Sequence, residues 1–491
     1  MQYATVLRWG VIGGLFAIPF ISFLVASGGF VPAMFFPFIT GKNFAFRILV
    51  EILLALYVLL ALRDPQYRPR SSLLGWAMLA FVVWVGIATI FSVDPAKSFW
   101  SNFERMEGYI ALLHLFSYFI VAGAVLTAER MWERFFQTSI GVSALQGLIA
   151  LFQLFGWVAI STQSGPRVDT TFGNATYLAV FLLFNFFLTL FMLARLYGQS
   201  GKRPNGWLQA FYGVALVLQI IGLFFTETRG AILGLLGGLI IMALYIAWQA
   251  REPQWRTVRK IAWGALGVIV IVVAGFFAVK DTAFIQSTPA LSRLASISLE
   301  DRTTLSRFLI WNMAYQGFLE RPVVGWGQEN FSFVFNKYYN PGMYDQEEWF
   351  DRAHNQFLDW LIAGGLPAFL LYLSFFLLTA WAVFRSQVLK APEQAALLGL
   401  LAAYAFHSLF VFDNLISAVY FFTVLAFVHG LSRKELPGFM FLSRPLGDRA
   451  LAVAAPIVAV ALVFIVFQFN FSGIARAQAL IKALQVNSTD L

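Results

Sequence analysis

The sequence predicts an all-α, polytopic membrane protein with about 12 or 13 transmembrane helices. Of its 491 residues, 59% are hydrophobic and only 12% are charged, whereas a soluble domain carries about 25% charged residues. Apolar runs of about 20 residues, each long enough to cross a bilayer, recur from one end of the chain to the other. One long polar and aromatic stretch, residues 280–365, interrupts them and is predicted to be a large external loop containing amphipathic helices.

Composition excludes several classes of site. The net charge of +9 requires no nucleic acid, because membrane proteins collect lysine and arginine in their cytoplasmic loops. The chain has no cysteine, which excludes disulfides, thiolate metal sites and cysteine nucleophiles. The first apolar run, residues 7–26, is followed by further spans rather than by a small-residue cleavage site, so we expect no cleavable signal peptide.

The apolar runs define the expected spans in order. They lie near residues 7–26, 43–62, 72–92, 108–127, 135–157, 173–194, 207–225, 229–249, 260–279, 366–384, 394–411, 415–431 and 450–469. No clean repeat relates them. The two inverted halves that mark many transporters are not evident either.

Charge in the short connections predicts the orientation. With the N-terminus in the cytoplasm, every expected cytoplasmic connection contains arginine or lysine. The chain then divides into nine spans in 1–279, the large external loop 280–365, four spans in 366–469 and an external tail, 470–491. The tail has apolar residues at helical spacing, which predicts a helical extension; a helical-repeat domain in a longer parent protein would continue this pattern.

The large loop contains one clear amphipathic helix, which begins near residue 303. Ser306, Thr303 or Thr304 can cap its start, and Pro322 ends it. One stripe at helical spacing consists of Arg307, Trp311, Ala314 and Phe318. An arginine on such a helix is either solvated or snorkelling, or packed on a functional surface with its aromatic neighbours.

A turn and a second helix follow in the loop. Gly325 and Gly327 can take left-handed backbone angles. We expect the next helix to begin near Asp351, with Asp351 as its N-cap. This would put His354 in the first helical turn, where backbone N–H groups and the helix dipole attract an anion. His354 is then either a structural histidine or a general base whose ring is oriented by acidic neighbours.

An acidic patch precedes this second helix. It consists of Asp345, Glu347, Glu348 and Asp351. Oxygen ligands of this kind can bind Ca²⁺ or Mg²⁺, but a solvated acidic loop has the same pattern. No HExxH or DxD motif is present, and we expect neither a metal nor another cofactor.

Arg229 is the most prominent basic candidate. It lies in TETRGAILG, where an apolar span resumes at once. An arginine at this depth is costly unless it is paired or lines a polar cavity, and it marks a functional site by default. The alternative is an interfacial anchor paired with Glu227. Gly230, next in sequence, would let a substrate approach the helix start closely.

A second polar loop, RVDTTFGNATYLA, enters the sixth span. It contributes Arg167, Asn174 and Tyr177 as further candidates for substrate binding. Asn174 can equally cap the following helix, and Tyr177 can be an ordinary interfacial aromatic. In the large loop, Arg352 and Asn355 flank His354 and complete the set of candidates.

Several segments together resemble the O-antigen ligase and polymerase superfamily of bacterial membrane glycosyltransferases. They are TFGNATYLA, TETRGAILG, SRFLIWNMAYQGFLERPVVGWGQENF, DRAHNQFLDWLIAGGLPAFLLYL and VFDNLISAVYFF. The resemblance spans roughly residues 70–430, and its specificity lies in the joined pattern R-x3-W, ERPVxGxGxxNF and AHNxFL.

The resemblance implies a GT-C-like fold and a definite activity. A glycan would pass from a polyprenyl diphosphate carrier to a hydroxyl group on a glycolipid, glycan or protein, with inversion and without a metal. Transfer would occur at the outer, periplasmic face of the bacterial inner membrane. The family's residues fall on Arg229 and Arg307, which would bind the diphosphate, and on His354, which would act as general base.

Three alternatives to a ligase-like enzyme stay open. An O-antigen or exopolysaccharide polymerase and a protein O-oligosaccharyltransferase use the same donor. A transporter or flippase for lipid-linked sugars would account for external arginines and for buried charges such as Glu51 without catalysis. A transporter should couple to an ion or proton gradient, whereas a transferase should act in detergent without any gradient.

Overall fold

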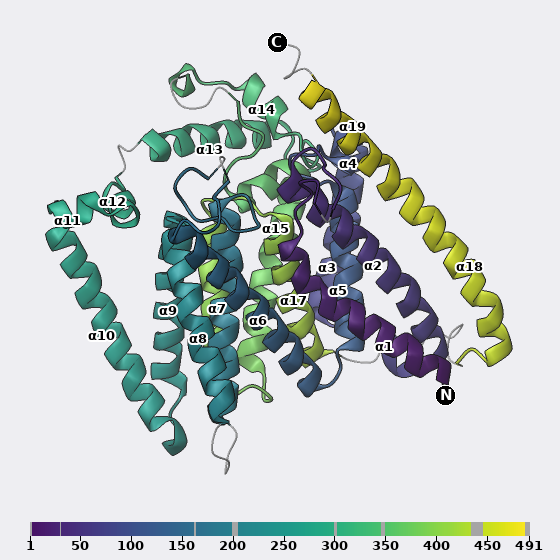
Figure 1. Ribbon diagram of the computed structural model, residues 1–491, viewed down its shortest axis with the longest axis horizontal. Helices are drawn as coiled ribbons and strands as arrows, with labels where there is room; N and C mark the ends of the chain where they lie inside the picture. The colour runs from purple at the N-terminus through teal and green to yellow at the C-terminus, as the bar shows by residue number, and fades with distance from the viewer. Residues whose placement is uncertain are drawn as a thin grey trace. The chain divides into compact units, whose positions relative to one another are not determined.

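The computed structural model describes residues 2–29, 31–161, 164–198, 205–298, 302–344, 349–433 and 445–486 (Figure 1). These residues form helices joined by loops and turns, and none of them lies in an extended β-strand. Within the described part of the chain, eleven helices are long and apolar enough to cross a membrane. The expected all-α, multi-pass class is therefore confirmed.

Each of the eleven helices coincides with an expected span. The two other expected spans, near 108–127 and 394–411, correspond to helices α5 (Tyr109–Val125) and α16 (Ala391–Ser408), of 17 and 18 residues. The helical tail is also present, as α19 (Ser472–Val486). Apolar run length therefore predicted the positions of these helices well.

The chain folds into two compact units, each assembled from separate stretches. Unit 1 comprises 1–135, 327–329 and 414–491, and unit 2 comprises 136–326 and 330–413. Helix α6 (Glu129–Leu154) runs from unit 1 into unit 2. All the residues expected to carry function belong to unit 2.

Unit 1 contains the helices from both ends of the chain. They are α1 (Gln2–Ala17), α2 (Pro37–Arg63), α3 (Leu73–Ile90), α4 (Pro95–Trp100), α5, α17 (Leu415–Ser432), α18 (Asp448–Val466) and α19, with short helical turns at Ile18–Phe23, Pro65–Tyr67 and Phe467–Phe471. Glu51 of α2 is buried, and its carboxylate lies 2.9 Å from both His114 Nε2 and Asn470 Nδ2. These partners give Glu51 a structural role in joining three segments, so its burial no longer requires a transport pathway.

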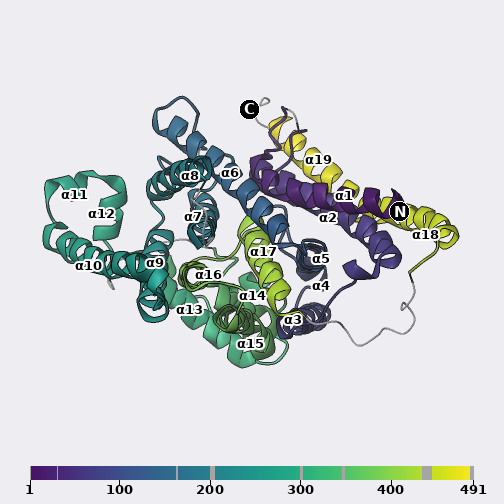
Figure 2. The ribbon, with the colours of Figure 1, turned by 90° about the horizontal axis from the view of Figure 1, so that it is seen from below.

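Unit 2 contains the remaining helices. They are α7 (Ala175–Gly198), α8 (Gly206–Phe225), α9 (Arg229–Gln249), α10 (Arg256–Val279), α11 (Ala283–Ser287), α12 (Pro289–Ala295), α13 (Arg302–Glu320), α14 (Phe331–Lys337), α15 (Gln356–Arg385) and α16, with short turns at Pro253–Trp255 and Pro341–Met343. Helix α16 packs beside α7 and α9, as the end-on view in Figure 2 shows. A buried ion pair between Arg195 and Glu393, 3.1 Å apart, joins α7 to α16.

Small residues bring α9 and α16 into close contact. A Cβ atom on Gly234 would lie 2.7 Å from the Ala403 carbonyl oxygen, and one on Gly238 would lie 2.5 Å from the Gly399 carbonyl oxygen. Such residues let two membrane helices approach backbone to backbone. The glycine-rich GLLGG segment of α9 therefore serves helix packing at Gly234 and Gly238.

Gly238→Ala is expected to destabilise the protein by about 1–3 kcal/mol, because the added methyl group forces two packed backbones apart. Gly237→Ala is the matched control: it lies on the same helix, with open space around its Cβ position. It should be neutral or slightly stabilising, since alanine favours helix more than glycine does. Thermal unfolding in detergent measures both variants, and equal midpoints would contradict the close α9–α16 contact.

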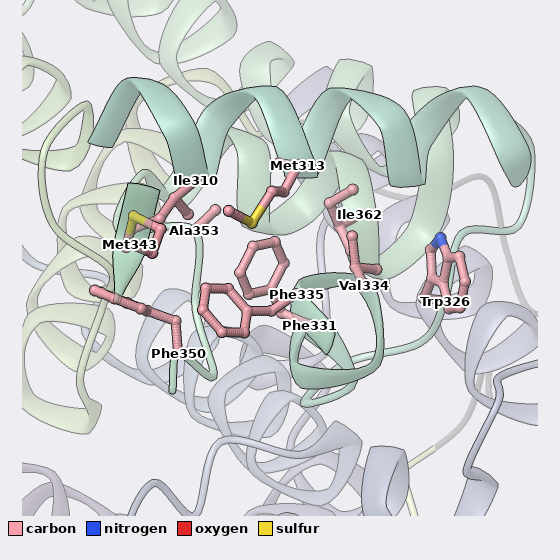
Figure 3. Close-up of a cluster of buried hydrophobic side chains, with 11 residues drawn as sticks. Ile310, Met313, Trp326, Phe331, Val334, Phe335, Met343, Phe350, Ala353 and Ile362 are labelled. Carbon is pink, nitrogen blue, oxygen red and sulfur yellow. The ribbon is translucent and has the colours of Figure 1, made fainter. Parts of the chain in front are cut away.

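A compact apolar cluster supports the large loop. Figure 3 shows its side chains converging beneath α13: Ile310, Met313, Ala314, Trp326, Phe331, Val334, Phe335, Met343, Phe350, Ala353 and Ile362. The cluster joins α13, α14 and the start of α15. The face of α13 that carries Ala314 and Phe318 packs here, as its stripe predicted.

Glycine residues allow the turn after α13 to pack closely against α15. Gly325 and Gly327 have φ angles of 69° and 90°, so the expected left-handed geometry is confirmed. Gly325 fits against a break inside α15, where Gly365 also has a left-handed φ of 66°. Hydrogen bonds from Trp326 N to Ile362 O (2.7 Å) and from Leu366 N to Pro322 O (2.8 Å) cross this contact.

Two expected helix caps are wrong, although α13 does begin near residue 303, as predicted. Helix α13 already includes Arg302, and Ser306 Oγ donates to the Arg302 carbonyl within the helix rather than capping it; Thr303 and Thr304 likewise lie inside the helix. Its end at Glu320, two residues before Pro322, matches the prediction.

The second error concerns the start of α15, which is at Gln356 rather than near Asp351. Asn355 is the N-cap, because its side-chain oxygen accepts hydrogen bonds from the backbone N–H groups of Phe357 and Leu358. His354 therefore precedes the helix instead of occupying its first turn.

Candidate functional site

The candidate site is assembled from four segments of unit 2. These are the first turn of α9, one face of α13, the turn before α15, and residues 407–412 at the end of α16. Arg229, Arg307 and His354 come from the first three of these segments. The contacts of residues 407–412 connect them.

Arg229 is the first residue of α9, as the boundary of the apolar run predicted. Its Nη2 atom donates to Ser296 Oγ, 2.8 Å away. Glu227, the partner expected if Arg229 were only an anchor, instead lies 3.6 Å from Arg293. Two arginines and a buried carboxylate therefore meet at the mouth of this span, which is an unusual concentration of charge at a helix start.

Arg307 lies on the face of α13 that turns toward the end of α16. Its guanidinium carbon is 5.6 Å from the centroid of the Phe410 ring, a cation–π contact. Phe410 Cβ is in turn only 3.8 Å from the position of a Cβ on Gly230. Arg307 is also near enough to His407 to interact with it electrostatically. The contacts of Phe410 thus bring Arg307 toward the first turn of α9.

His354 occupies a strained turn between two aromatic rings. Its φ angle is +52°, a conformation that non-glycine residues adopt rarely and often at functional sites. The Phe350 and Phe412 rings flank the imidazole with centroids 5.2 Å away, each edge-on. The side chain is partly exposed, so the aromatic pair holds the ring without sealing it from a substrate.

The hydrogen bond at the His354 ring favours one tautomer. Nδ1 lies 3.3 Å from the carbonyl oxygen of Arg352. A carbonyl oxygen can only accept, so Nδ1 carries the proton in the neutral ring. Nε2 then carries the basic lone pair of the ring, as a general base requires.

Neighbouring residues hold the backbone of this turn. Trp311 Nε1 donates to the Ala353 carbonyl at 3.1 Å, and Ala353 N donates to Asp359 Oδ1 at 2.8 Å. Ala353 itself is buried in the apolar cluster of Figure 3. The stripe on α13 thus has two roles, since Arg307 contributes charge and Trp311 positions the turn that carries His354.

Residues 407–412 are the part of the site that the sequence did not reveal. The expected spans 394–411 and 415–431 put His407 inside a span and left residues 412–414 as a short connection. In the structure, Phe410 contacts Arg307, and Phe412 contacts both His354 and Arg352; the Arg352 guanidinium carbon lies 5.9 Å from the Phe412 centroid. The sequence signal here was the segment VFDNLISAVYFF, which begins at Val411 and therefore includes Phe412 but not His407 or Phe410.

The other candidates fall into two groups. Arg167 lies beside the charged mouth of α9. Burial, and then the positive charge of Arg293, lower its pKa, and Glu227 opposes this effect. Because Arg167 is partly buried and lies near a second positive charge, binding of an anion next to it is favourable.

Asn174, Tyr177 and Asn355 have structural roles. Asn174 Oδ1 accepts from Thr176 N at 2.8 Å and caps α7, Asn355 caps α15, and Tyr177 is buried within α7. None of these contacts involves Arg229 or Arg307.

The structure shows no metal-binding group of histidine and carboxylate side chains among the residues it describes. Three members of the acidic patch, Asp345, Glu347 and Glu348, lie outside the described residues. The fourth, Asp351, is buried.

The fold and these residues define a class: a multi-pass helical membrane protein in which the segments carrying Arg229, Arg307 and His354 each contact residues 407–412. Within this class, residues 214–373 match the family model described as O-antigen ligase. This match confirms the resemblance to the O-antigen ligase and polymerase superfamily. The matched segment contains Arg229, Arg307, Arg352, His354 and Asn355. A search of curated proteins returned no match.

Proposed function

We propose that this protein transfers a glycan from a polyprenyl-diphosphate-linked donor to an acceptor hydroxyl group, as an O-antigen ligase does. The family match supports ligase-like glycan transfer in general. The observation that carries the finer proposal is the contact of residues 407–412 with both the Arg307 side chain and the His354 ring. This arrangement supports a role for Arg307 in binding the diphosphate and for His354 as the base for a hydroxyl group.

The proposed reaction is a direct displacement at the anomeric carbon. His354 Nε2 accepts the proton of the acceptor hydroxyl as its oxygen attacks. The bond between the anomeric carbon and the diphosphate oxygen breaks, and polyprenyl diphosphate leaves with the electron pair. A single in-line displacement inverts the configuration at the anomeric carbon.

The arginines would stabilise the leaving group. Arg229 and Arg307 carry planar guanidinium groups, which bind phosphate oxygens in pairs. Two such groups can meet the charge of a diphosphate without a metal ion. Arg167 and Arg293, at the mouth of α9, add positive potential along the approach of an anionic donor.

We further propose that the site opens on the periplasmic face of the bacterial inner membrane. The positive-inside pattern of the connections supports this orientation. A polymerase or a protein O-oligosaccharyltransferase would use the same donor chemistry with another acceptor. Buried Glu51 is no longer an argument for a transporter, because its carboxylate is paired with His114 and Asn470 within unit 1.

Purified protein in detergent should glycosylate an acceptor when given a polyprenyl-diphosphate-linked oligosaccharide, with excess EDTA present. Parallel reactions offer a lipid A–core acceptor, a second copy of the glycan and a serine-containing peptide. The product formed identifies the ligase, polymerase or protein-glycosylating reaction. Dependence of transfer on added Mg²⁺ or Mn²⁺ would contradict the metal-independent mechanism. Movement of the donor across liposome membranes without transfer would favour the transporter.

A further inference from the structure

His407 is a buried polar residue that the proposed mechanism does not yet use. It lies in the last turns of α16, and its side chain is only 3% exposed. Its Nδ1 atom has no hydrogen-bond partner among the described residues. A buried nitrogen without a hydrogen-bond partner costs free energy. We therefore expect Nδ1 to gain a partner when a ligand binds.

Nδ1 of His407 faces the first turn of α9. The nearest atom to a Cβ built on Gly230 is this nitrogen, at 3.6 Å. Because residue 230 is glycine, no side chain lies between the helix start and the imidazole. The side chain of Thr228, the N-cap residue, does not cap α9. Its hydroxyl group donates to the Thr226 carbonyl instead. The N–H groups and dipole of α9 therefore favour an anion here.

Two arginines adjoin the residues of this contact. Arg229 is the first residue of α9, and Arg307 interacts electrostatically with His407 from α13. A neutral imidazole adds a hydrogen-bond donor to this group without adding a third charge. Three features therefore lie together: the start of α9, the glycine at position 230 and the buried Nδ1 of His407.

We propose that His407 is a binding residue for the donor's diphosphate, and that its Nδ1–H donates a hydrogen bond to a phosphate oxygen lying over Gly230. This inference rests on the proposed function, because it identifies a further residue of the same donor site. It also explains why a residue without a side chain occupies position 230. The oxygen takes the space that a Cβ would fill.

Gly230→Ala tests the proposal without touching His407. The new methyl group would meet its nearest neighbours at ordinary contact distances, so the helix should form normally, and alanine favours it. Gly237→Ala, on the same helix with open space around it, is the matched control. At position 407, phenylalanine removes the donor, whereas asparagine retains an N–H near the position of Nδ1.

The probes are farnesyl diphosphate and farnesyl monophosphate, titrated against the full chain in detergent, with thermal unfolding measured in parallel. Gly230→Ala and His407→Phe should each weaken farnesyl diphosphate binding by about tenfold or more, which corresponds to one lost hydrogen bond to a charged group. Gly237→Ala should bind like the wild type, and His407→Asn should recover most of the loss. The monophosphate should bind more weakly and respond less.

The double variant distinguishes a shared contact from two separate packing effects. If Gly230 and His407 serve the same oxygen, Gly230→Ala with His407→Phe should bind no more weakly than either single variant. Additive losses, or wild-type affinity in both folded single variants, would overturn the assignment of His407 while leaving the transferase proposal intact. Failure of the wild type to bind farnesyl diphosphate would remove this inference and the donor site together.

Discussion

Replacing His354 with asparagine is expected to lower the rate of glycan transfer by roughly 100- to 10,000-fold, the usual contribution of a positioned general base. Asparagine tolerates the left-handed backbone angle found at this position better than most residues do. The turn before α15 should therefore keep its shape, while the amide cannot accept a proton. Single-turnover transfer, measured beside donor affinity, reports the two effects separately.

Donor affinity is the internal control for this variant. It should stay close to that of the wild type, because His354 is assigned to the acceptor hydroxyl and not to the diphosphate. His354→Ala should lose turnover as well, with added backbone strain. Normal turnover in His354→Asn would show that the general-base assignment is wrong. A loss confined to donor binding would instead move His354 to the donor site.

Arg229→Lys and Arg307→Lys are expected to weaken binding of the polyprenyl diphosphate donor by about tenfold or more each, and the alanine variants should weaken it further. Lysine keeps the charge but cannot form the two parallel hydrogen bonds of a guanidinium group. Titration of the lipid-linked donor in detergent measures the change. Since the leaving group carries the charge, the rate of transfer should fall together with the affinity.

Arg256→Lys is the matched control for Arg229→Lys. Arg256 is likewise the first residue of a long apolar helix, α10, and it is exposed. Its replacement should leave donor affinity unchanged. Full affinity in Arg229→Lys would argue against bidentate binding of the diphosphate at the start of α9. An equal loss in Arg256→Lys would point to a general effect of charge near the membrane.

Features that depend on neighbouring residues in the chain could be predicted from the sequence. The spans follow from the length of the apolar runs, and Arg229 was identified because an arginine stands where such a run begins. The left-handed angles at Gly325 and Gly327 and the cap at Asn174 likewise follow from local residue preferences.

Features that depend on tertiary contacts could not be predicted. The start of α15 was placed near Asp351, because an acidic residue there resembles an N-cap. Asn355 fills that role instead, since Asp359 and Trp311 bind the backbone at Ala353 and shape the turn before the helix. The contribution of residues 407–412 depends on contacts with α9, α13 and His354. The contacting pairs are separated by 58 residues (His354 and Phe412) to 177 residues (Gly230 and His407) along the chain, and no local pattern encodes such contacts.

The most direct test of the transferase proposal follows the leaving group. Purified protein is incubated in detergent and EDTA with one equivalent of polyprenyl-diphosphate-linked oligosaccharide and an excess of acceptor. Mass spectrometry then counts free polyprenyl diphosphate and glycosylated acceptor. The proposal predicts that the two appear in equal amounts with the wild type and are nearly absent with His354→Asn. Intact donor after prolonged incubation with every acceptor class, despite measured donor binding, would contradict it.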